Sequence, residues 1–145
     1  MTLFPAGVNV DEINRKWLPK LDQSLGVRVI SCGNDRLLAE LDITEALLQP
    51  FGVMHGGVSC VLGESLGSIA GGMTLRDPGQ TVVGQSLYAL HLRPVKVGMT
   101  LEAEAIAEHI GRRSQIWTIQ LRDKATQKPT AKVTLTLAVI DLPKA

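Results

Sequence analysis

The second half of the chain alternates apolar and polar residues in long runs. In the last run, single threonines separate Val133, Leu135 and Leu137, which gives a period of two residues. This period is typical of a strand with one buried face. Three earlier runs are also strand-like, so we expect four long strands joined by short turns, at residues 81–93, 99–110, 117–122 and 132–139.

Residues 58–73 follow a different pattern. Apolar and small residues recur there at helical spacing, at Val58, Val61, Leu62, Ser65, Leu66, Ile69 and Met73. The same stretch holds Gly63, Gly67, Gly71 and Gly72. Each of these glycines costs a helix about 1 kcal/mol relative to alanine. Such a helix needs close approach by other backbone, so we expect it to be wrapped by the rest of the chain.

The first half of the chain predicts shorter elements. A helix is expected over about residues 10–18, with Asn9 or Asp11 near its N-cap and Pro19 ending it. Strands are expected at 27–31 and 36–43, joined by a hairpin turn at 33–35, and a loop at 44–57.

This order of elements indicates the fold class. One short helix, two strands, one long glycine-rich helix and four long strands favour an α+β fold with an antiparallel sheet over βαβ units. A single long helix wrapped by a curved antiparallel sheet is the hotdog arrangement. With 145 residues, we expect one domain spanning 1–145.

Composition narrows the function classes. Hydrophobic residues make up 45% of the chain, and the 15 basic and 14 acidic residues are interspersed, with a net charge of +1. This balance predicts neither nucleic acid nor a membrane surface as a partner. Cys32 and Cys60 form no CxxC pair, and no signal peptide is recognisable at the N-terminus. We therefore expect a cytoplasmic protein with reduced thiols.

The start of the predicted long helix offers one candidate site. His55, Gly56 and Gly57 lie there, and the first amides of a helix have no intrahelical acceptor and carry partial positive charge. Glycine lets a substrate carbonyl approach these amides, so the site is suited to an oxyanion. The alternative is that the glycines only permit a tight turn.

Glu64 is the one carboxylate in this otherwise apolar and small-residue helix. Charged residues are seldom buried unless they are paired or functional, so Glu64 is either a candidate catalytic group or a salt-bridged or rim-exposed glutamate. Ser68 lies one turn further along the same face. It is placed to hydrogen-bond the carboxylate, although helical serines more often cap a carbonyl or fill space.

The spacing of these two candidates predicts an oligomer. Gly56 and Glu64 are eight residues apart, about 12 Å along a helix. Two groups that act on one carbonyl must lie within about 3.5 Å of the reacting atom. If both residues are catalytic, two antiparallel copies of the helix must share each site, so we expect a homodimer, with a homotetramer as a further assembly.

Motifs for other chemistries are missing from the sequence. HExxH, P-loop and GxGxxG patterns do not occur, and the three histidines lack metal-ligand spacing. A GxSxG pattern occurs at residues 63–67, but it lies inside the predicted helix and not at the strand-to-helix turn of a nucleophile elbow. We therefore expect no metal and no cofactor.

The segment 49–68, QPFGVMHGGVSCVLGESLGS, resembles the PaaI-type hotdog acyl-CoA thioesterases, and is closest to the 1,4-dihydroxy-2-naphthoyl-CoA and 4-hydroxybenzoyl-CoA types. The likeness continues through 82–84, 91–93 and 111–117 and covers about residues 25–140. It implies that Glu64 is the nucleophile or general base and that the Gly56 amide polarises the thioester carbonyl. The resemblance further implies that Gln49 and His55 assist the amide and that Ser68 orients the carboxylate or water.

The resemblance also implies substrate contacts, at Gly84, at His91, Leu92, Arg93 and Pro94, and at the turn residues His109, Gly111, Arg112, Arg113 and Ser114. Arg112 and Arg113 would pair with the CoA phosphates, or belong to an ordinary solvated turn. His91 would bind substrate, or be a core or rim histidine.

Three functions stay open at this point. The first is hydrolysis of an aromatic or medium-chain acyl-CoA, with Glu64 activating water or attacking the thioester itself. The second is a non-catalytic acyl-CoA binding module. The third is a hotdog-fold dehydratase, for which His55 with Glu64 is the candidate pair.

Overall fold

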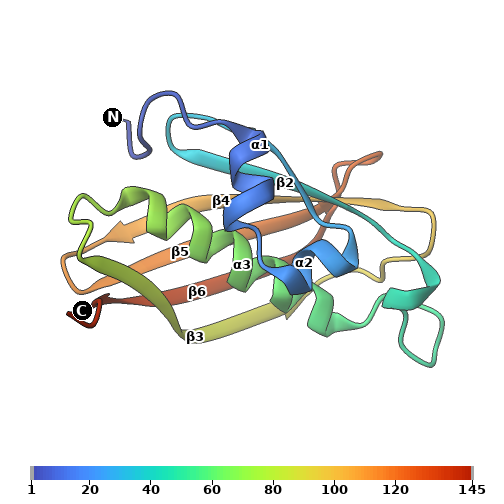
Figure 1. Cartoon of the computed structure of the whole chain (residues 1–145). Helices are drawn as coiled ribbons and strands as arrows, with labels where there is room; N and C mark the ends of the chain where they lie inside the picture. The colour runs from blue at the N-terminus through green and yellow to red at the C-terminus, as the bar shows by residue number, and fades with distance from the viewer. Residues whose placement is uncertain (1, 145) are drawn as a thin grey trace.

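The computed structural model describes residues 2–144. A six-stranded antiparallel sheet, in the order β1-β2-β4-β5-β6-β3, lies against one long helix, α3 (Gly56–Thr74) (Figure 1). The strands are β1 (Arg28–Cys32), β2 (Arg36–Asp42), β3 (Gln80–His91), β4 (Thr100–Ile110), β5 (Ser114–Asp123) and β6 (Pro129–Asp141). The α+β hotdog prediction is therefore confirmed, and the predicted strands agree to within a few residues.

The predicted N-terminal helix at 10–18 is present at residues 10–17, but it is α-helical only in its first turn. The chain forms one α-helical turn, α1 (Val10–Glu12), and then a π-helical stretch, η1 (Ile13–Trp17). The predicted cap is confirmed, since the Asn9 side chain accepts a hydrogen bond from the Asp11 amide at 2.7 Å. A second helix, α2 (Lys20–Leu25), was missed. Pro19 ends one helix and immediately precedes the next, because proline is tolerated where a helix has no amide to satisfy.

The loop before α3 also contains a short 3-10 helix, η2 (Glu45–Leu47). None of the helices between residues 2 and 144 is both long enough and apolar enough to span a bilayer.

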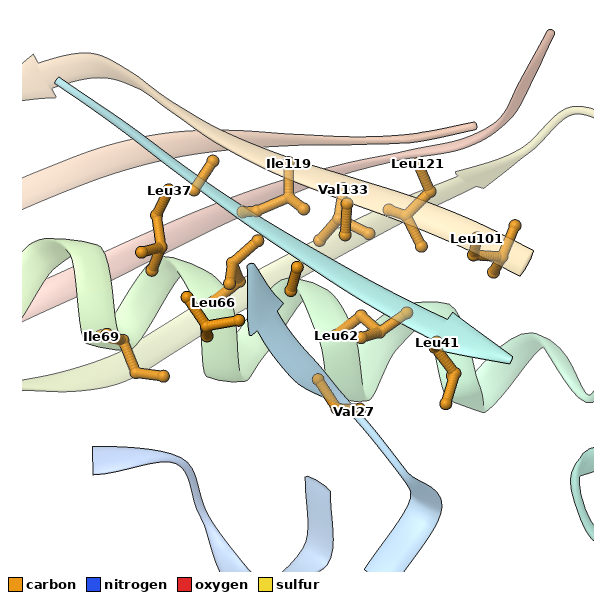
Figure 2. Packing of buried hydrophobic residues seen from close by; sticks show 14 of the residues in the cluster. Val27, Leu37, Leu41, Leu62, Leu66, Ile69, Leu101, Ile119, Leu121 and Val133 are labelled. Atoms are coloured by element: carbon orange, nitrogen blue, oxygen red, sulfur yellow. The ribbon is translucent and has the colours of Figure 1, made fainter. Parts of the chain in front are cut away.

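The core lies between α3 and the sheet. Leu62, Leu66 and Ile69 of α3 pack with side chains from the central strands, and Figure 2 shows this packing at Leu37, Leu41, Leu101, Ile119, Leu121 and Val133. Burial of these aliphatic side chains, each contributing about 1.5–3 kcal/mol, holds the helix in one orientation. That orientation leaves Glu64, which lies between Leu62 and Leu66 in the sequence, outside the core.

Three of the helical glycines let α3 lie close to the sheet. A Cβ added at Gly63 would lie 2.8 Å from Val133 Cβ, and one at Gly67 would lie 2.6 Å from Leu135 Cδ2. One at Gly71 would lie 2.7 Å from Gln115 Oε1. The prediction that the rest of the chain wraps α3 is confirmed. The groups that approach the helical glycines are side chains of β5 and β6, however, and not backbone, because alternate side chains of a strand point towards the helix.

Strand β3 is an edge of the sheet. It pairs with β6 on one side, and within residues 2–144 no strand pairs with its other side. Tyr88 and Leu90 of this strand are exposed. A long unpaired edge with exposed apolar side chains is suited to pairing with another chain.

Candidate active site

The start of α3 presents one free backbone donor. His55 caps the helix, because its Nδ1 accepts the Gly57 amide at 2.8 Å. The Val58 amide donates to the His55 carbonyl at 3.0 Å. No group between residues 2 and 144 accepts the Gly56 amide, so it is available to a ligand at the positive end of a 19-residue helix.

His91 packs directly against this donor. A Cβ added at Gly56 would lie 3.0 Å from His91 Cε1 and 3.1 Å from its Nε2, so glycine is needed for this approach. A hollow of about 340 Å³ lies here. Its lining includes Gly56 and all four of the predicted contact residues, His91, Leu92, Arg93 and Pro94.

The segment that follows β3 is held rigidly around the hollow. The Leu92 and Arg93 amides both donate to the Thr130 carbonyl, at 2.8 and 3.2 Å. The Arg93 guanidinium donates to the Pro129 carbonyl at 2.7 Å. The structure thus brings Gly56 together with residues that lie far from it in the sequence.

Glu64 is exposed on the flank of α3 and forms no ion pair with any residue of the described chain. Its carboxylate lies against Gly84 of β3, where an added Cβ would be 2.8 Å from Glu64 Cδ. The strand register shifts between Gly84 and Ser86. Gly84, which the resemblance assigns to substrate contact, therefore also makes room for the carboxylate. The only sign in the sequence that another group approaches β3 closely at this point is a glycine within a strand pattern.

The surroundings of Glu64 are apolar. A hollow of about 260 Å³ is lined by Glu64, Ser65 and the side chains of Leu21, Cys60, Val61 and Leu87. Leu21 belongs to α2, which the sequence did not predict, so sequence reasoning missed this wall of the site.

Ser68 lies one turn after Glu64, but no hydrogen bond joins the two side chains in the part of the chain that is described. Ser68 lines a neighbouring hollow of about 510 Å³. Its role in orienting the carboxylate or water stays a prediction.

A buried acid beside this site was also missed by sequence reasoning. Asp22 of α2 is only 1% exposed, and its Oδ2 accepts the Ser65 hydroxyl at 2.7 Å. Its Oδ1 has no partner among the described residues. Burial raises the pKa of the Asp22 carboxyl, and the hydrogen bond from Ser65 opposes this less strongly.

Gln49 is oriented by its own loop. Its side-chain carbonyl accepts the Phe51 amide, and within residues 2–144 its NH₂ group has no acceptor, so it stays available as a donor. The Gln49 amide donates to the Val53 carbonyl at 2.8 Å, which closes the loop. Gln49 does not line the hollow at Gly56.

The turn from His109 to Ser114 lies at the other end of the molecule's long helix. It leads into Gln115, whose side chain contacts Gly71, about 22 Å from Gly56 along α3. The Gly111 amide donates to the Ser114 carbonyl at 2.8 Å, and an added Cβ at Gly111 would lie 2.6 Å from His109 Nε2.

Arg112 and Arg113 are exposed and form no ion pair with the described residues. Within one chain, the structure therefore does not bring this turn to Gly56.

Ligands for a metal do not cluster in the structure. Across residues 2–144, no group of three or more His, Cys, Asp or Glu side chains is placed to hold an ion. Cys32 and Cys60 are both free thiols.

Comparisons with known proteins agree with this geometry. Residues 51–130 match the family model described as the thioesterase superfamily. A 1,4-dihydroxy-2-naphthoyl-CoA hydrolase of Listeria monocytogenes is 37% identical over 120 residues, which cover 82% of this chain and 94% of the relative. The crystal structure of a thioesterase from Haemophilus influenzae has a TM-score of 0.89 at 36% identity, covering 98% of this chain and 97% of that one.

The Escherichia coli PaaI protein shares the fold, with a TM-score of 0.79 at 21% identity, over 93% of this chain and 94% of that one. The free Gly56 amide and the Glu64 carboxylate lie on a chain that matches this family over more than half its length. The chain therefore belongs to the thioesterase superfamily and is a thioester hydrolase.

Proposed function

We propose that this protein hydrolyses the thioester of an aromatic or medium-chain acyl-CoA, with Glu64 as its catalytic carboxylate. The observation that carries the proposal is the free Gly56 amide at the start of α3, together with exposed Glu64 on the same helix. The amide would stabilise the oxyanion that forms when the carbonyl is attacked. Glu64 would activate a water or attack the carbonyl itself to give a mixed anhydride.

His55 and Gln49 would support the oxyanion side of the site. His55 accepts the Gly57 amide and so fixes the first turn, which keeps the Gly56 amide free. The NH₂ group of Gln49, whose carbonyl already accepts the Phe51 amide, would be a second donor for a carbonyl oxygen. Ser68 would orient the carboxylate or the attacking water once substrate occupies the hollow beside it.

The proposed catalytic unit is a homodimer with shared sites. Gly56 and Glu64 lie on one helix, about 12 Å apart, so they cannot serve one carbonyl within a chain. The unpaired edge of β3 supports pairing with a second copy, which would place the two α3 helices antiparallel. Two such dimers would form the homotetramer.

The same arrangement explains how one CoA would meet distant elements. Within a chain, Arg112 and Arg113 belong to the end of α3 remote from Gly56. Antiparallel helices would bring the turn of one subunit towards the Gly56 hollow of the other. There the two guanidinium groups would pair with CoA phosphates. The 1,4-dihydroxy-2-naphthoyl-CoA hydrolase among the relatives supports a CoA substrate.

We further propose that the reaction needs no cofactor and takes place in the reducing cytoplasm. The two free thiols are compatible with that compartment.

A panel of acyl-CoA thioesters tests the proposal. We expect free CoA to be released from benzoyl-, naphthoyl- or octanoyl-CoA, detected with a thiol reagent. Hydration of an enoyl-CoA without CoA release would identify a dehydratase. Tight binding of acyl-CoA without either reaction would identify a binding module, and the proposal would then be wrong.

A further inference from the structure

The sheet has a second edge, β1, at the side opposite β3. β1 pairs only with β2, and no strand between residues 2 and 144 pairs with its outer side. A hollow of about 630 Å³ lies beside this edge, and its lining includes Asn14, Val29 and Ile30. Ile30 is 39% exposed, so the N-terminal segment does not bury the edge. Because unpaired strand edges are templates for pairing with another chain, β1 needs some other protection.

The side chain of Asn14 occupies this edge. Its Oδ1 accepts the Val29 amide at 2.8 Å, and its Nδ2 donates to the Val29 carbonyl at 2.8 Å. A residue of a neighbouring antiparallel strand would form the same two hydrogen bonds with Val29. The Asn14 amide therefore takes the place of one residue of an added strand.

The orientation of the Asn14 amide is fixed by a third hydrogen bond. Nδ2 also donates to the Val10 carbonyl at 3.1 Å, so both hydrogens of the NH₂ group are used. α1 and η1, which carry Val10 and Asn14, pack against β1. The amide is thus held at the edge by the helical segment that carries it.

The β3 edge has no comparable cover. No side chain of the described residues forms a hydrogen bond with the backbone of residues 81–91. β3 is also longer, with 12 residues against five in β1. The two edges of the sheet therefore differ, because one is closed by a side chain and the other is open.

We propose that Asn14 closes the β1 edge against β1 of a second copy of this chain, so that pairing through sheet edges stops at two chains. This inference rests on the pairing of β3 edges in the proposed function. One self-complementary edge per chain gives a closed dimer. With two such edges, each chain would pair on both sides, and the sheet would extend from chain to chain without closing.

The mass of the assembly tests the proposal. Light scattering after size-exclusion chromatography would compare wild type with Asn14→Ala from low to high micromolar concentration, with circular dichroism to show that both are folded. Wild type should keep one mass. Asn14→Ala should form species of at least about double that mass, and their share should rise with concentration. An unchanged mass in folded Asn14→Ala would overturn the proposal.

Two control variants separate an opened edge from a loosened N-terminal segment. Asn9→Ala removes the cap of α1 without touching β1, and it should keep the wild-type mass. Asn14→Ala combined with Ile30→Lys places a charge on the reopened edge, and it should return to the wild-type mass because edge lysines oppose strand pairing. Larger species that persist with Ile30→Lys, or that also form in Asn9→Ala, would overturn the proposal.

Hydrogen exchange at the Val29 amide reports the edge itself. In dilute Asn14→Ala this amide should exchange at least about tenfold faster than in wild type, because it has lost its acceptor. The exchange should slow again as the larger species form. An equal rate in the two dilute proteins would show that Asn14 does not hold the edge.

The same measurements separate this inference from the proposed function. A monomeric wild type would remove the pairing of β3 edges, and Asn14→Ala should then stop at a dimer formed through β1 alone. That result would leave the role of Asn14 standing. An active wild-type dimer or tetramer, with an unchanged mass in Asn14→Ala, would do the reverse.

Discussion

Glu64 is the residue on which the proposed reaction depends most directly. Its carboxylate is exposed, is held against Gly84, and has apolar neighbours. Glu64→Gln should keep the fold and CoA affinity but lower kcat by a factor on the order of 10² to 10⁴, the range for losing positioned acid–base catalysis. Glu64→Asp should also be slow, because the shorter side chain withdraws the carboxylate from the carbonyl.

Steady-state kinetics with free-CoA detection would measure both variants. Glu45→Gln is the matched control, because Glu45 is also exposed and begins the short helix η2, away from Glu64. Wild-type turnover in Glu64→Gln would show that another group performs the chemistry.

Two adjacent glycines should respond oppositely to the same substitution. Gly72→Ala should stabilise the protein by about 1 kcal/mol, because alanine favours the helix and its Cβ meets no close neighbour. Gly71→Ala should destabilise it by about 1–3 kcal/mol, because the new Cβ would press on Leu137 and Gln115. Urea unfolding midpoints would measure both changes. Equal effects of the two substitutions would mean that α3 is not oriented as described.

At the scale of elements, the buried Asp22–Ser65 hydrogen bond anchors α2 to α3. Burial raises the pKa of the Asp22 carboxyl in the folded protein. The stability that protonated Asp22 contributes is therefore fully present below the pKa of Asp22 in the unfolded chain, near 3.8. This stability is lost as the pH rises through the pKa of Asp22 in the folded protein. Asp22→Asn does not titrate and keeps an acceptor for Ser65. It should therefore unfold at a higher temperature than wild type at neutral pH, with the difference closing in acid.

Thermal unfolding between pH 3 and 8 would follow this effect. Asp22→Ala is the contrasting variant, since it leaves the buried Ser65 hydroxyl without an acceptor and should cost about 1–3 kcal/mol. A constant difference between wild type and Asp22→Asn across the pH range would contradict the assignment.

The β4–β5 turn is the second element with a separable role. Arg112→Ala and Arg113→Ala should each raise KM for acyl-CoA by about two- to fivefold, the effect of up to 1 kcal/mol for an exposed charge pair. Hydrolysis of the matching acyl-pantetheine should change little, because that substrate lacks the phosphates. Lys132→Ala, which removes an exposed charge on β6, is the control. Equal losses on both substrates would indicate a structural role for the arginines.

At the scale of the whole molecule, the shared site allows complementation between subunits. One chain would carry Glu64→Gln, and the other Gln49→Ala with Gly56→Pro. Gly56 is the first residue of α3, a position that tolerates proline, and proline removes the proposed oxyanion donor. In a heterodimer, one site would hold both lesions and the other none, so activity should return towards half the wild-type value per heterodimer.

The chains would be mixed, denatured and refolded, and differently tagged heterodimers purified. Each inactive homodimer must first show native circular dichroism, because the proline also displaces His91 from Gly56. Tagged heterodimers that form but stay inactive would place both groups within one chain.

Most of the fold could be predicted from the sequence because the patterns that indicate its elements involve residues close together along the chain. The period of two in β6 and the helical spacing of α3 follow from which face of each element is buried, and both predictions hold. Helix α2 was not predicted, because its six residues are too few to show helical periodicity. Pro19 was interpreted only as the end of the preceding helix, although it also caps the start of α2.

By itself, the sequence determined the hotdog architecture, the position of Gly56 at the start of the long helix, and the spacing that keeps Gly56 and Glu64 apart in one chain. These features depend on residues close together along the chain. Only the tertiary structure decided that Gly84 receives the Glu64 carboxylate, that Asp22 anchors α2 through Ser65, and that Trp17 faces Gly72. The two residues of each pair belong to separate elements. Packing of the common core sets how these elements lie relative to one another, and no periodic pattern in the sequence indicates that placement.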